Sequence, residues 1–159
     1  MKVKILCGIS GSGKSTYISK HFPKAVVCSA DHFFLADNGE YVFDPQKLGA
    51  AHAYCLRKFV QHLQAPDLTG GQVGTLVVDN TNTSMQEIAP YAALATAYGH
   101  DTEIIVLQAD PVEAHKRNRH SVPLKSVMGQ FDRLRGLEKS LPPWWKVTKV
   151  GRNGQQTSG

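Results

Sequence analysis

The sequence predicts an α/β protein in which a parallel sheet of four to five strands carries helices on both faces. Apolar runs alternate with helical patterns along the chain of 159 residues, the order produced by parallel strands joined through helical crossovers. Two runs, "TLVV" at 75–78 and "IIVL" at 104–107, are apolar or β-branched at every position. Such runs are typical of strands that are covered on both faces.

Five runs are expected to form the strands, and turn-forming residues bound them. In chain order they lie at 2–7, 24–29, 75–80, 102–109 and 144–150. The aromatic segment at 30–45 has no regular period and is expected to be irregular, and the composition of 65–74 is that of a loop.

Helices are expected between these strands, and most have recognisable starts or stops. They lie at 14–22, at about 46–64, from Ser84 to about Tyr98, from Pro111, and from Pro123. Asp44-Pro45 and Asp110-Pro111 each combine an N-cap with a proline suited to the first turn. The series Ser84-Met85-Gln86-Glu87 fits a capping box, and Gly99 is a natural stop for that helix.

Two of these helices show a stripe that should face the core. In the helix at 46–64 the stripe is Leu48, Ala51, Cys55, Phe59 and Leu63. In the helix after Pro123 it is Leu124, Val127, Met128, Phe131 and Leu134.

Length and composition predict one soluble domain over 1–150, followed by a polar tail at 151–159 that we expect to be disordered. The three cysteines are scattered, have no C-x-x-C pair, and are expected to be reduced and mostly buried. No apolar run approaches the roughly 20 residues needed to cross a bilayer. Without a signal-peptide pattern, the expected compartment is the cytoplasm, or the host cytoplasm if the protein is viral.

Positive charge is concentrated in the last third of the chain. Residues 1–110 carry 8 Lys or Arg and 10 Asp or Glu, whereas residues 111–152 carry 10 and 3 respectively. A basic segment of this kind indicates an anionic partner, such as nucleotide phosphates or a nucleic acid backbone. The alternative is a solvated basic face without a partner.

The segment "GISGSGKS" at 8–15 matches G-x-x-x-x-G-K-[ST] between an expected strand and an expected helix, which is the context of a phosphate-binding P-loop. The expected fold is therefore that of a three-layer P-loop NTPase. Lys14 would reach the β- and γ-phosphates of a bound nucleoside triphosphate, and Ser15 would ligate Mg²⁺. The nucleotide-binding candidates are Gly8, Ser10, Gly11, Ser12, Gly13, Lys14, Ser15 and Thr16. A glycine-rich turn without a ligand is the alternative.

Carboxylates follow the second and third expected strands, at the edge where ligands of parallel sheets bind. Asp31 lies where a transfer to a hydroxyl would need a proton acceptor. Asp79 lies where a carboxylate could hold Mg²⁺ through water. The alternatives are a turn or helix-cap aspartate for Asp31 and a strand-end aspartate bonded to local backbone for Asp79.

A basic segment, Lys116-Arg117-Asn118-Arg119-His120, ends the fourth expected helix. It could close over a triphosphate and stabilise transition-state charge, or simply be a basic helix terminus favoured by the helix dipole. Phe33, Phe34, Tyr41 and Phe43 could stack on bases, or could pack the irregular segment onto the domain.

Four segments resemble a known family in order and spacing: "GISGSGKSTY", "CSADHFF…YVFDPQKLGAAH", "VVDNTNT" and "KRNRHSVP". The resemblance, over about residues 1–136, is to the small polynucleotide-kinase-like P-loop kinases. That group includes phage polynucleotide 5′-kinases, related eukaryotic kinase modules, and phage kinases of hydroxymethyl-uracil bases in DNA.

By position, the resemblance implies that Asp31 is the general base and that Arg117 and Arg119 are lid residues near the phosphates. It implies that Asn80 and Thr81 face the acceptor, and Phe33 and Phe34 complete the set of acceptor-binding candidates. Phe34 also marks a departure, because phage polynucleotide kinases carry a basic residue there, near the acceptor's phosphate.

The resulting expectation is a kinase that uses Mg²⁺ and ATP to phosphorylate a hydroxyl of a nucleic acid, DNA more than RNA. The hydroxyl is either a polynucleotide 5′-hydroxyl or a hydroxymethyl group on a modified base, which would have to leave the stack. The alternatives are a kinase of a small metabolite or sugar nucleotide, and an ATP-binding interaction module without transfer activity. The sequence leaves the oligomeric state open.

Overall fold

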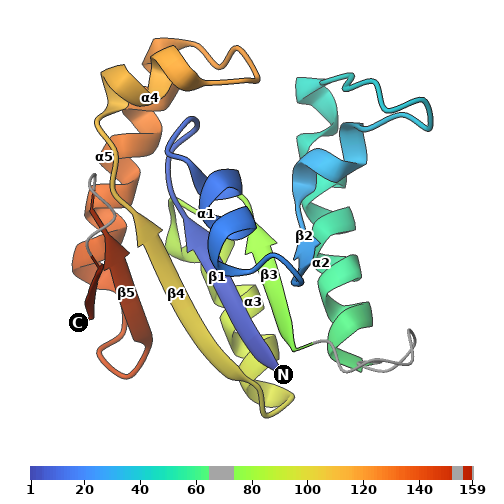
Figure 1. The fold of residues 1–159 in the computed structure, drawn as a ribbon, viewed down its shortest axis with the longest axis vertical. Helices are drawn as coiled ribbons and strands as arrows, with labels where there is room; N and C mark the ends of the chain where they lie inside the picture. Colours follow the sequence, from blue (N-terminus) through green and yellow to red (C-terminus); the bar gives the residue numbers. More distant parts are fainter. Residues whose placement is uncertain (65–73, 152–155, 159) are drawn as a thin grey trace.

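A computed structural model describes residues 1–64, 74–151 and 156–158, and is organised by one sheet with strand order β2-β3-β1-β4-β5-β6 (Figure 1). The strands are β1 (Lys2–Cys7), β2 (Val26–Cys28), β3 (Thr75–Asp79), β4 (Asp101–Leu107), β5 (Lys146–Val150) and β6 (Gln156–Ser158). The first five pair in parallel, and β6 is antiparallel to β5. The predicted fold class is confirmed.

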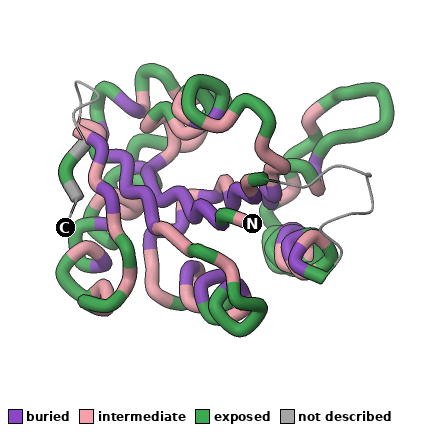
Figure 2. The backbone as a smooth tube through the Cα atoms, turned by 60° about the horizontal axis from the view of Figure 1, so that its bottom comes forward, coloured by how far each residue is buried: buried purple, intermediate pink, exposed green. Residues whose placement is uncertain are grey.

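Helices cover both faces of this sheet (Figure 1). They are α1 (Lys14–His21), α2 (Leu48–Gln64), α3 (Met85–Ala97), α4 (Pro111–Arg117) and α5 (Leu124–Ser140), with 3₁₀ turns η1 (Ala30–Phe34) and η2 (Pro45–Lys47). On one face Ile18 of α1 packs in a cluster with Leu6 of β1. On the other face Phe59, Ile88 and Leu134 bring α2, α3 and α5 into a second, larger cluster. Figure 2 shows the buried residues concentrated along the strands.

The capping residues predicted for three helical segments are found at their ends. Asp44 and Asp110 accept hydrogen bonds from the first-turn N–H groups of η2 and α4. The Glu87 carboxylate accepts from the backbone N–H of Ser84 at 2.9 Å, as a capping box requires. Gly99 ends α3 with a φ of +73°, a backbone conformation that glycine adopts without strain.

Both predicted stripes are wrong at their N-terminal ends. Leu48 is 42% exposed because it is the first residue of α2, and the buried stripe starts at Ala51. On α5, Leu124 and Met128 are exposed, and Leu137 is buried instead. Val127, which lies between them in the sequence, is fully buried, so the core-facing stripe of α5 runs through Val127, Leu134 and Leu137 instead.

Strand and tail boundaries differ too. The strand predicted at 24–29 is only Val26–Cys28, because Ser29 already caps η1. Part of the tail predicted to be disordered instead forms β6, since backbone pairing with the edge strand β5 does not require apolar side chains. The loop predicted at 65–74 lies outside the described residues except for Gly74.

The three cysteines are free and buried, as predicted. Within the described ranges no helix combines the length and apolarity needed to cross a membrane.

A buried ion pair crosses the α1 face of the sheet. The Lys4 ammonium on β1 donates to the Glu103 carboxylate on β4, which also accepts from the Thr148 hydroxyl on β5. Burial raises the pKa of Glu103, but these two hydrogen bonds and the charges of Lys4 and Lys146 outweigh it and hold that pKa below its ordinary value.

We therefore expect Glu103 to stabilise the fold above the ordinary glutamate pKa and to lose that contribution as the pH falls through its lowered folded pKa. Glu103→Gln should lower the free energy of unfolding by about 2 kcal/mol at pH 7, because Lys4 loses its buried countercharge. Urea titrations at pH 7 and pH 3 should show this difference shrinking in acid. Glu113→Gln, which breaks an exposed pair with Lys116, is the control and should change stability little. An undiminished Glu103 effect at pH 3 would contradict the assignment.

Candidate active site

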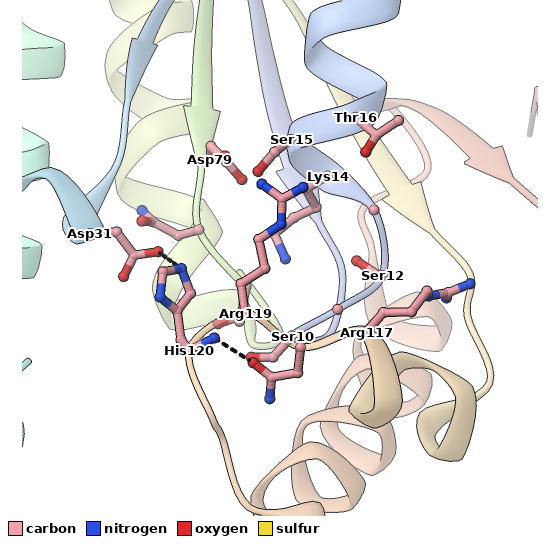
Figure 3. Close-up of a pocket in the computed structure, with 15 residues that line it drawn as sticks. Ser10, Ser12, Lys14, Ser15, Thr16, Asp31, Asp79, Arg117, Arg119 and His120 are labelled. Carbon is pink, nitrogen blue, oxygen red and sulfur yellow. Dashed lines mark hydrogen bonds and ion pairs between the residues drawn. The ribbon is translucent and has the colours of Figure 1, made fainter. Parts of the chain in front are cut away.

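A cavity of about 480 Å³ opens at the carboxyl ends of the central strands (Figure 3). Four segments that are remote in sequence line it, as the parallel topology predicts. They are the glycine-rich loop and the start of α1 at 10–16, Asp31 on η1, Asp79–Thr81 at the end of β3, and Arg117–His120 at the end of α4. Gly8 does not line the cavity; its N–H donates to the Thr81 carbonyl at 2.9 Å and so ties the loop to β3.

The loop between β1 and α1 has the geometry of an anion cradle. Gly11 and Gly13 take φ values of +78° and +93°, which lets the backbone curl around the cavity. Among the described residues no side chain caps α1, so its first-turn N–H groups are left for a ligand. The Ser12 hydroxyl is buried and has no hydrogen-bond partner in the described chain. These donors fit the oxygens of a bound phosphate chain.

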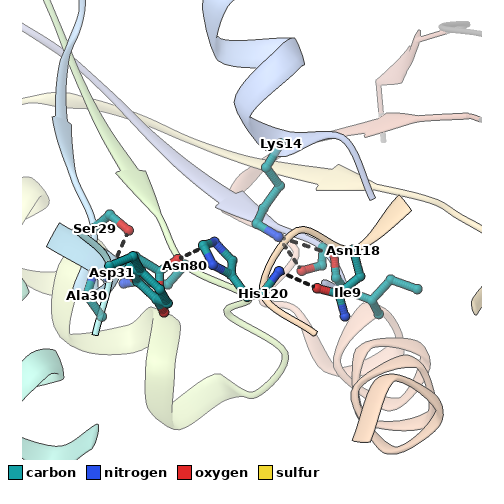
Figure 4. Close-up of polar contacts among 10 residues, drawn as sticks. Ile9, Lys14, Ser29, Ala30, Asp31, Asn80, Asn118 and His120 are labelled. Atoms are coloured by element: carbon teal, nitrogen blue, oxygen red, sulfur yellow. Dashed lines mark hydrogen bonds and ion pairs between the residues drawn. The ribbon is translucent and has the colours of Figure 1, made fainter. Parts of the chain in front are cut away.

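Lys14 lies at the centre of this cradle. Its ammonium donates to the carbonyls of Gly8 at 2.9 Å and Ile9 at 3.2 Å (Figure 4). Burial lowers the pKa of Lys14, and the charges of Asp79 and Asp31 oppose that shift. The residue is thus a cation held on the loop by bonds that an anionic ligand can replace.

Asp79 ends β3 and faces the same space as Ser15 and Lys14 (Figure 3). Burial raises the pKa of Asp79, while Lys14 lowers it. In the described ranges no group of three or more His, Cys, Asp or Glu side chains could hold a metal ion. Ser15 and Asp79 therefore fit a Mg²⁺ ion only if phosphate oxygens and water supply its remaining ligands.

Asp31 is placed on the other side of the cavity by η1. The Ser29 hydroxyl accepts from the Asp31 N–H at 3.2 Å, and the Asn80 side-chain carbonyl accepts from the Ala30 N–H at 2.9 Å (Figure 4). The Asn80 amide also contacts the Cys55 sulfur at 3.4 Å. Asn80 thus lines the cavity as predicted, but its polar groups fasten η1 to β3.

Phe33 and Phe34, predicted as acceptor-binding residues, do not line the cavity. Phe34 is 5% exposed and packs edge-on against Phe33, Tyr41 and Phe43, with the nearest centroid at 5.2 Å. Phe33 is half-buried and lies 5.9 Å from the Tyr54 ring. Both phenylalanines therefore pack the irregular segment onto the domain, which was the alternative to a binding role.

The basic segment after α4 reaches over the cavity. Arg119 is directed toward the space between Asp79, Ser15 and Lys14 (Figure 3). Arg117, at the end of α4, lies on the side of the cavity where Ser12 is. His120 approaches Asp31, with 3.7 Å between Nε2 and Oδ2. The segment therefore adds cationic and imidazole groups on both sides of the site.

Contacts of three residues near the cavity were not predicted from the sequence. The Tyr41 hydroxyl donates to Asp31 Oδ1 at 3.1 Å, and His120 faces the other oxygen. The Gln130 side-chain oxygen on α5 accepts from the Ser10 N–H at 2.8 Å. Tyr41 and His120 stood in segments that were already singled out, but nothing in the pattern at Gln130 pointed to the loop.

Gly11 offers a test of the close packing behind the loop. A Cβ atom on Gly11 would lie 1.9 Å from the Ala114 carbonyl oxygen of α4, whereas one on Gly39 would meet nothing within 4 Å. Both residues have positive φ, at +78° and +82°. We expect Gly39→Ala to cost about 1–2 kcal/mol from backbone strain alone. Gly11→Ala should cost more because the same strain is joined by a backbone clash. Urea unfolding measures the difference, and equal costs would contradict the packing.

Comparison with protein families shows that residues 3–125 match the family described as "AAA domain". The human protein NEDD4-binding protein 2 is 30% identical in an alignment of 132 residues that covers 77% of this chain. The match spans only 7% of the human protein, so it concerns a small part of that relative.

Solved structures share the fold at low sequence identity. The AvrRxo1-ORF1:AvrRxo1-ORF2 complex with sulphate ions aligns with a TM-score of 0.68 and 17% identity, over 99% of this chain and 57% of the other. The Pnkp1/Rnl/Hen1 RNA repair complex gives 0.69 and 18%, over 89% and 46%. A sugar kinase from Janibacter sp. HTCC2649 gives 0.57 and 17%, over 95% and 85%. These likenesses support the fold.

Proposed function

We propose, from the premise that this chain belongs to the AAA domain family matched by residues 3–125, that it is a P-loop phosphotransferase. It would transfer the γ-phosphate of ATP to a hydroxyl group. The observation that carries the proposal is the position of Asp31, which lines the same cavity as Lys14 and the glycine-rich loop. A site that only held a nucleotide would not need a carboxylate there.

One set of residues would bind ATP, the phosphate donor, and another would face the acceptor hydroxyl. The N–H groups at the start of α1 and the Lys14 ammonium would bind the β- and γ-phosphates. Mg²⁺, held by Ser15 and through water by Asp79, would neutralise charge on the phosphates. Arg117 and Arg119 would stabilise the charge that develops in the transition state. An ATP-bound form of the AvrRxo1 complex is among the structures with this fold.

Asp31 would act as the proton acceptor. As the acceptor oxygen forms its bond to the γ-phosphorus, the bond from that phosphorus to the β–γ bridging oxygen breaks, and the hydroxyl proton passes to the Asp31 carboxylate. The products are ADP and a phosphate monoester. Asp31 is half-exposed, with 54% of its side chain accessible, so an acceptor can reach it from solvent.

A nucleic acid is the acceptor that we favour, as a 5′-hydroxyl or as a hydroxymethyl group on a base in DNA. The support is the concentration of Lys and Arg at 111–152, which includes the segment over the cavity. A structure with this fold is described as part of an RNA repair complex. The phosphates of a polynucleotide would lie on the side of Arg117 and Arg119.

One observation favours a small-molecule acceptor as a second candidate. The irregular segment beside Asp31 carries three further acidic residues, Asp37, Glu40 and Asp44, and no Lys or Arg between 30 and 46. It also exposes Leu35, Val42 and Phe43. This side of the site would repel a polyanion and would suit a neutral or apolar group.

Transfer of label from γ-labelled ATP tests the proposal. The acceptor panel is single-stranded and duplex DNA with 5′-hydroxyl ends, RNA, DNA with hydroxymethylated bases, nucleosides and sugars. Labelled nucleic acid, with an acceptor KM that rises with salt, would support a nucleic acid as the acceptor. Labelling of small acceptors alone, with a salt-independent KM, would support the second. ATP binding without transfer to any acceptor would indicate a non-catalytic module and contradict the proposal.

A further inference from the structure

We propose that Tyr41 and His120 together position the Asp31 carboxylate, and that the turn carrying His120 thereby links the acceptor side of the site to Arg119 on the donor side. The inference rests on the proposed function, because it assigns Asp31 the role of proton acceptor. It gives Tyr41 and His120 a positioning role that the sequence did not indicate for either residue, and a reason why they act together.

Tyr41 fixes one oxygen of the carboxylate. Its hydroxyl donates to Asp31 Oδ1 at 3.1 Å, and its backbone forms a bridge with Leu35 across the irregular segment. The ring packs edge-on against buried Phe34, with 6.1 Å between centroids. Burial, with the charge of Asp31 and their hydrogen bond, raises the pKa of Tyr41 to about 12, so the hydroxyl remains a donor. An anchored donor of this kind leaves Asp31 with one free oxygen in a defined direction.

His120 approaches that second oxygen from the opposite wall. Its Nε2 lies 3.7 Å from Asp31 Oδ2, and its ring lies 4.5 Å from the Tyr41 ring, centroid to centroid. The two rings therefore contact each other while each addresses a different oxygen of Asp31. This mutual contact predicts that the effects of the two residues are coupled.

Asn118 sets the direction of His120 and of its neighbour. The Asn118 side chain accepts from the His120 N–H at 3.0 Å and donates to the Val122 carbonyl at 3.0 Å. Ser121 completes the turn with a φ of +53°. Consecutive side chains then diverge: Arg119 is directed toward Lys14 and Asp79, and His120 toward Asp31 (Figure 3). One turn thus reaches the phosphate cradle and the carboxylate at once.

The first test removes single groups. Tyr41→Phe keeps the ring and deletes the hydroxyl, and His120→Ala deletes the imidazole. Each should lower kcat for transfer about tenfold while the KM for ATP stays unchanged. Tyr41→Phe loses a hydrogen bond to a charged group, and His120→Ala loses the ring that packs on Tyr41 and approaches Oδ2 of Asp31. Tyr98→Phe and His52→Ala are matched controls, since Tyr98 accepts a surface hydrogen bond from Gln64 and both residues lie away from the cavity.

The double variant tests the coupling. Because each residue holds Asp31 only with the help of the other, Tyr41→Phe with His120→Ala should be no worse than about the poorer single variant. If the fall in kcat of the double variant equals the product of the two single falls, the residues act independently and the proposed coupling is wrong. A rise in the KM for ATP in place of a fall in kcat would overturn the assignment to the acceptor side.

A second measurement needs no substrate. Hydrogen exchange of the peptide covering 118–122 should speed up in Tyr41→Ala and stay unchanged in Tyr98→Ala, because only the first removes a ring that holds His120. Unchanged exchange in both would overturn the contact itself. If the wild-type protein transfers phosphate to no acceptor, the proposed function fails and takes the positioning role with it. The exchange result then still shows whether the turn is held by Tyr41, so the two failures are distinguishable.

Discussion

Asp31→Asn should lower the turnover of phosphate transfer by about 10²–10⁴-fold, the usual contribution of a general base. Asparagine keeps the shape of the side chain and can still accept from Tyr41, but it cannot take the proton of the acceptor hydroxyl. ATP should bind this variant as well as it binds the wild type, because Asp31 lies across the cavity from the loop that holds the phosphates.

Asp132→Asn is the matched control, since this exposed aspartate on α5 does not line the cavity. The measurements are single-turnover transfer rates and equilibrium ATP binding. Turnover at the wild-type level in Asp31→Asn would remove the residue from the role of proton acceptor. It would leave Asp31 as a residue of η1 whose oxygens only contact Tyr41 and His120.

Lys14→Ala should fail at an earlier stage, in the binding and activation of the triphosphate. Losing the cation at the centre of the cradle should lower turnover by about 10²–10³-fold and weaken ATP binding as well. Since Lys14 also offsets the effect of burial on Asp79, its removal should raise the pKa of Asp79 further.

Lys20→Ala serves as the control, because Lys20 is exposed on α1 and does not line the cavity. Together with Asp31→Asn, the Lys14 variant separates the two halves of the proposed site. One variant should retain ATP and lose transfer, and the other should lose both. ATP affinity unchanged in Lys14→Ala would contradict the proposed donor site.

The fold and the donor side of the site could be predicted from the sequence because their signals are local. The glycine-rich loop is a contiguous pattern, and the apolar strands around it have characteristic composition. Capping residues such as Asp110 act within one turn of their own helix. In each case the physical cause lies within a few residues of its effect.

The acceptor side was less predictable because it depends on tertiary contacts. Nothing near Asp31 in sequence indicates that His120, 89 positions away, faces it. Phe34 shows the converse problem, since a phenylalanine in an irregular segment suits both a binding surface and a small core. Only the packing of Phe33, Tyr41 and Phe43 around it distinguishes the two.

The contact between Gly11 and Ala114 also has a mechanical consequence. The loop backbone at Gly11 lies so close to the Ala114 carbonyl of α4 that a Cβ atom would not fit between them, so a shift of α4 toward the loop would also have to move the loop. A swing of the turn that carries Arg119 would then start beyond Ala114, near Arg117 at the end of α4. Because that point lies close to the cavity, a small rotation would move the Arg119 side chain only a short distance.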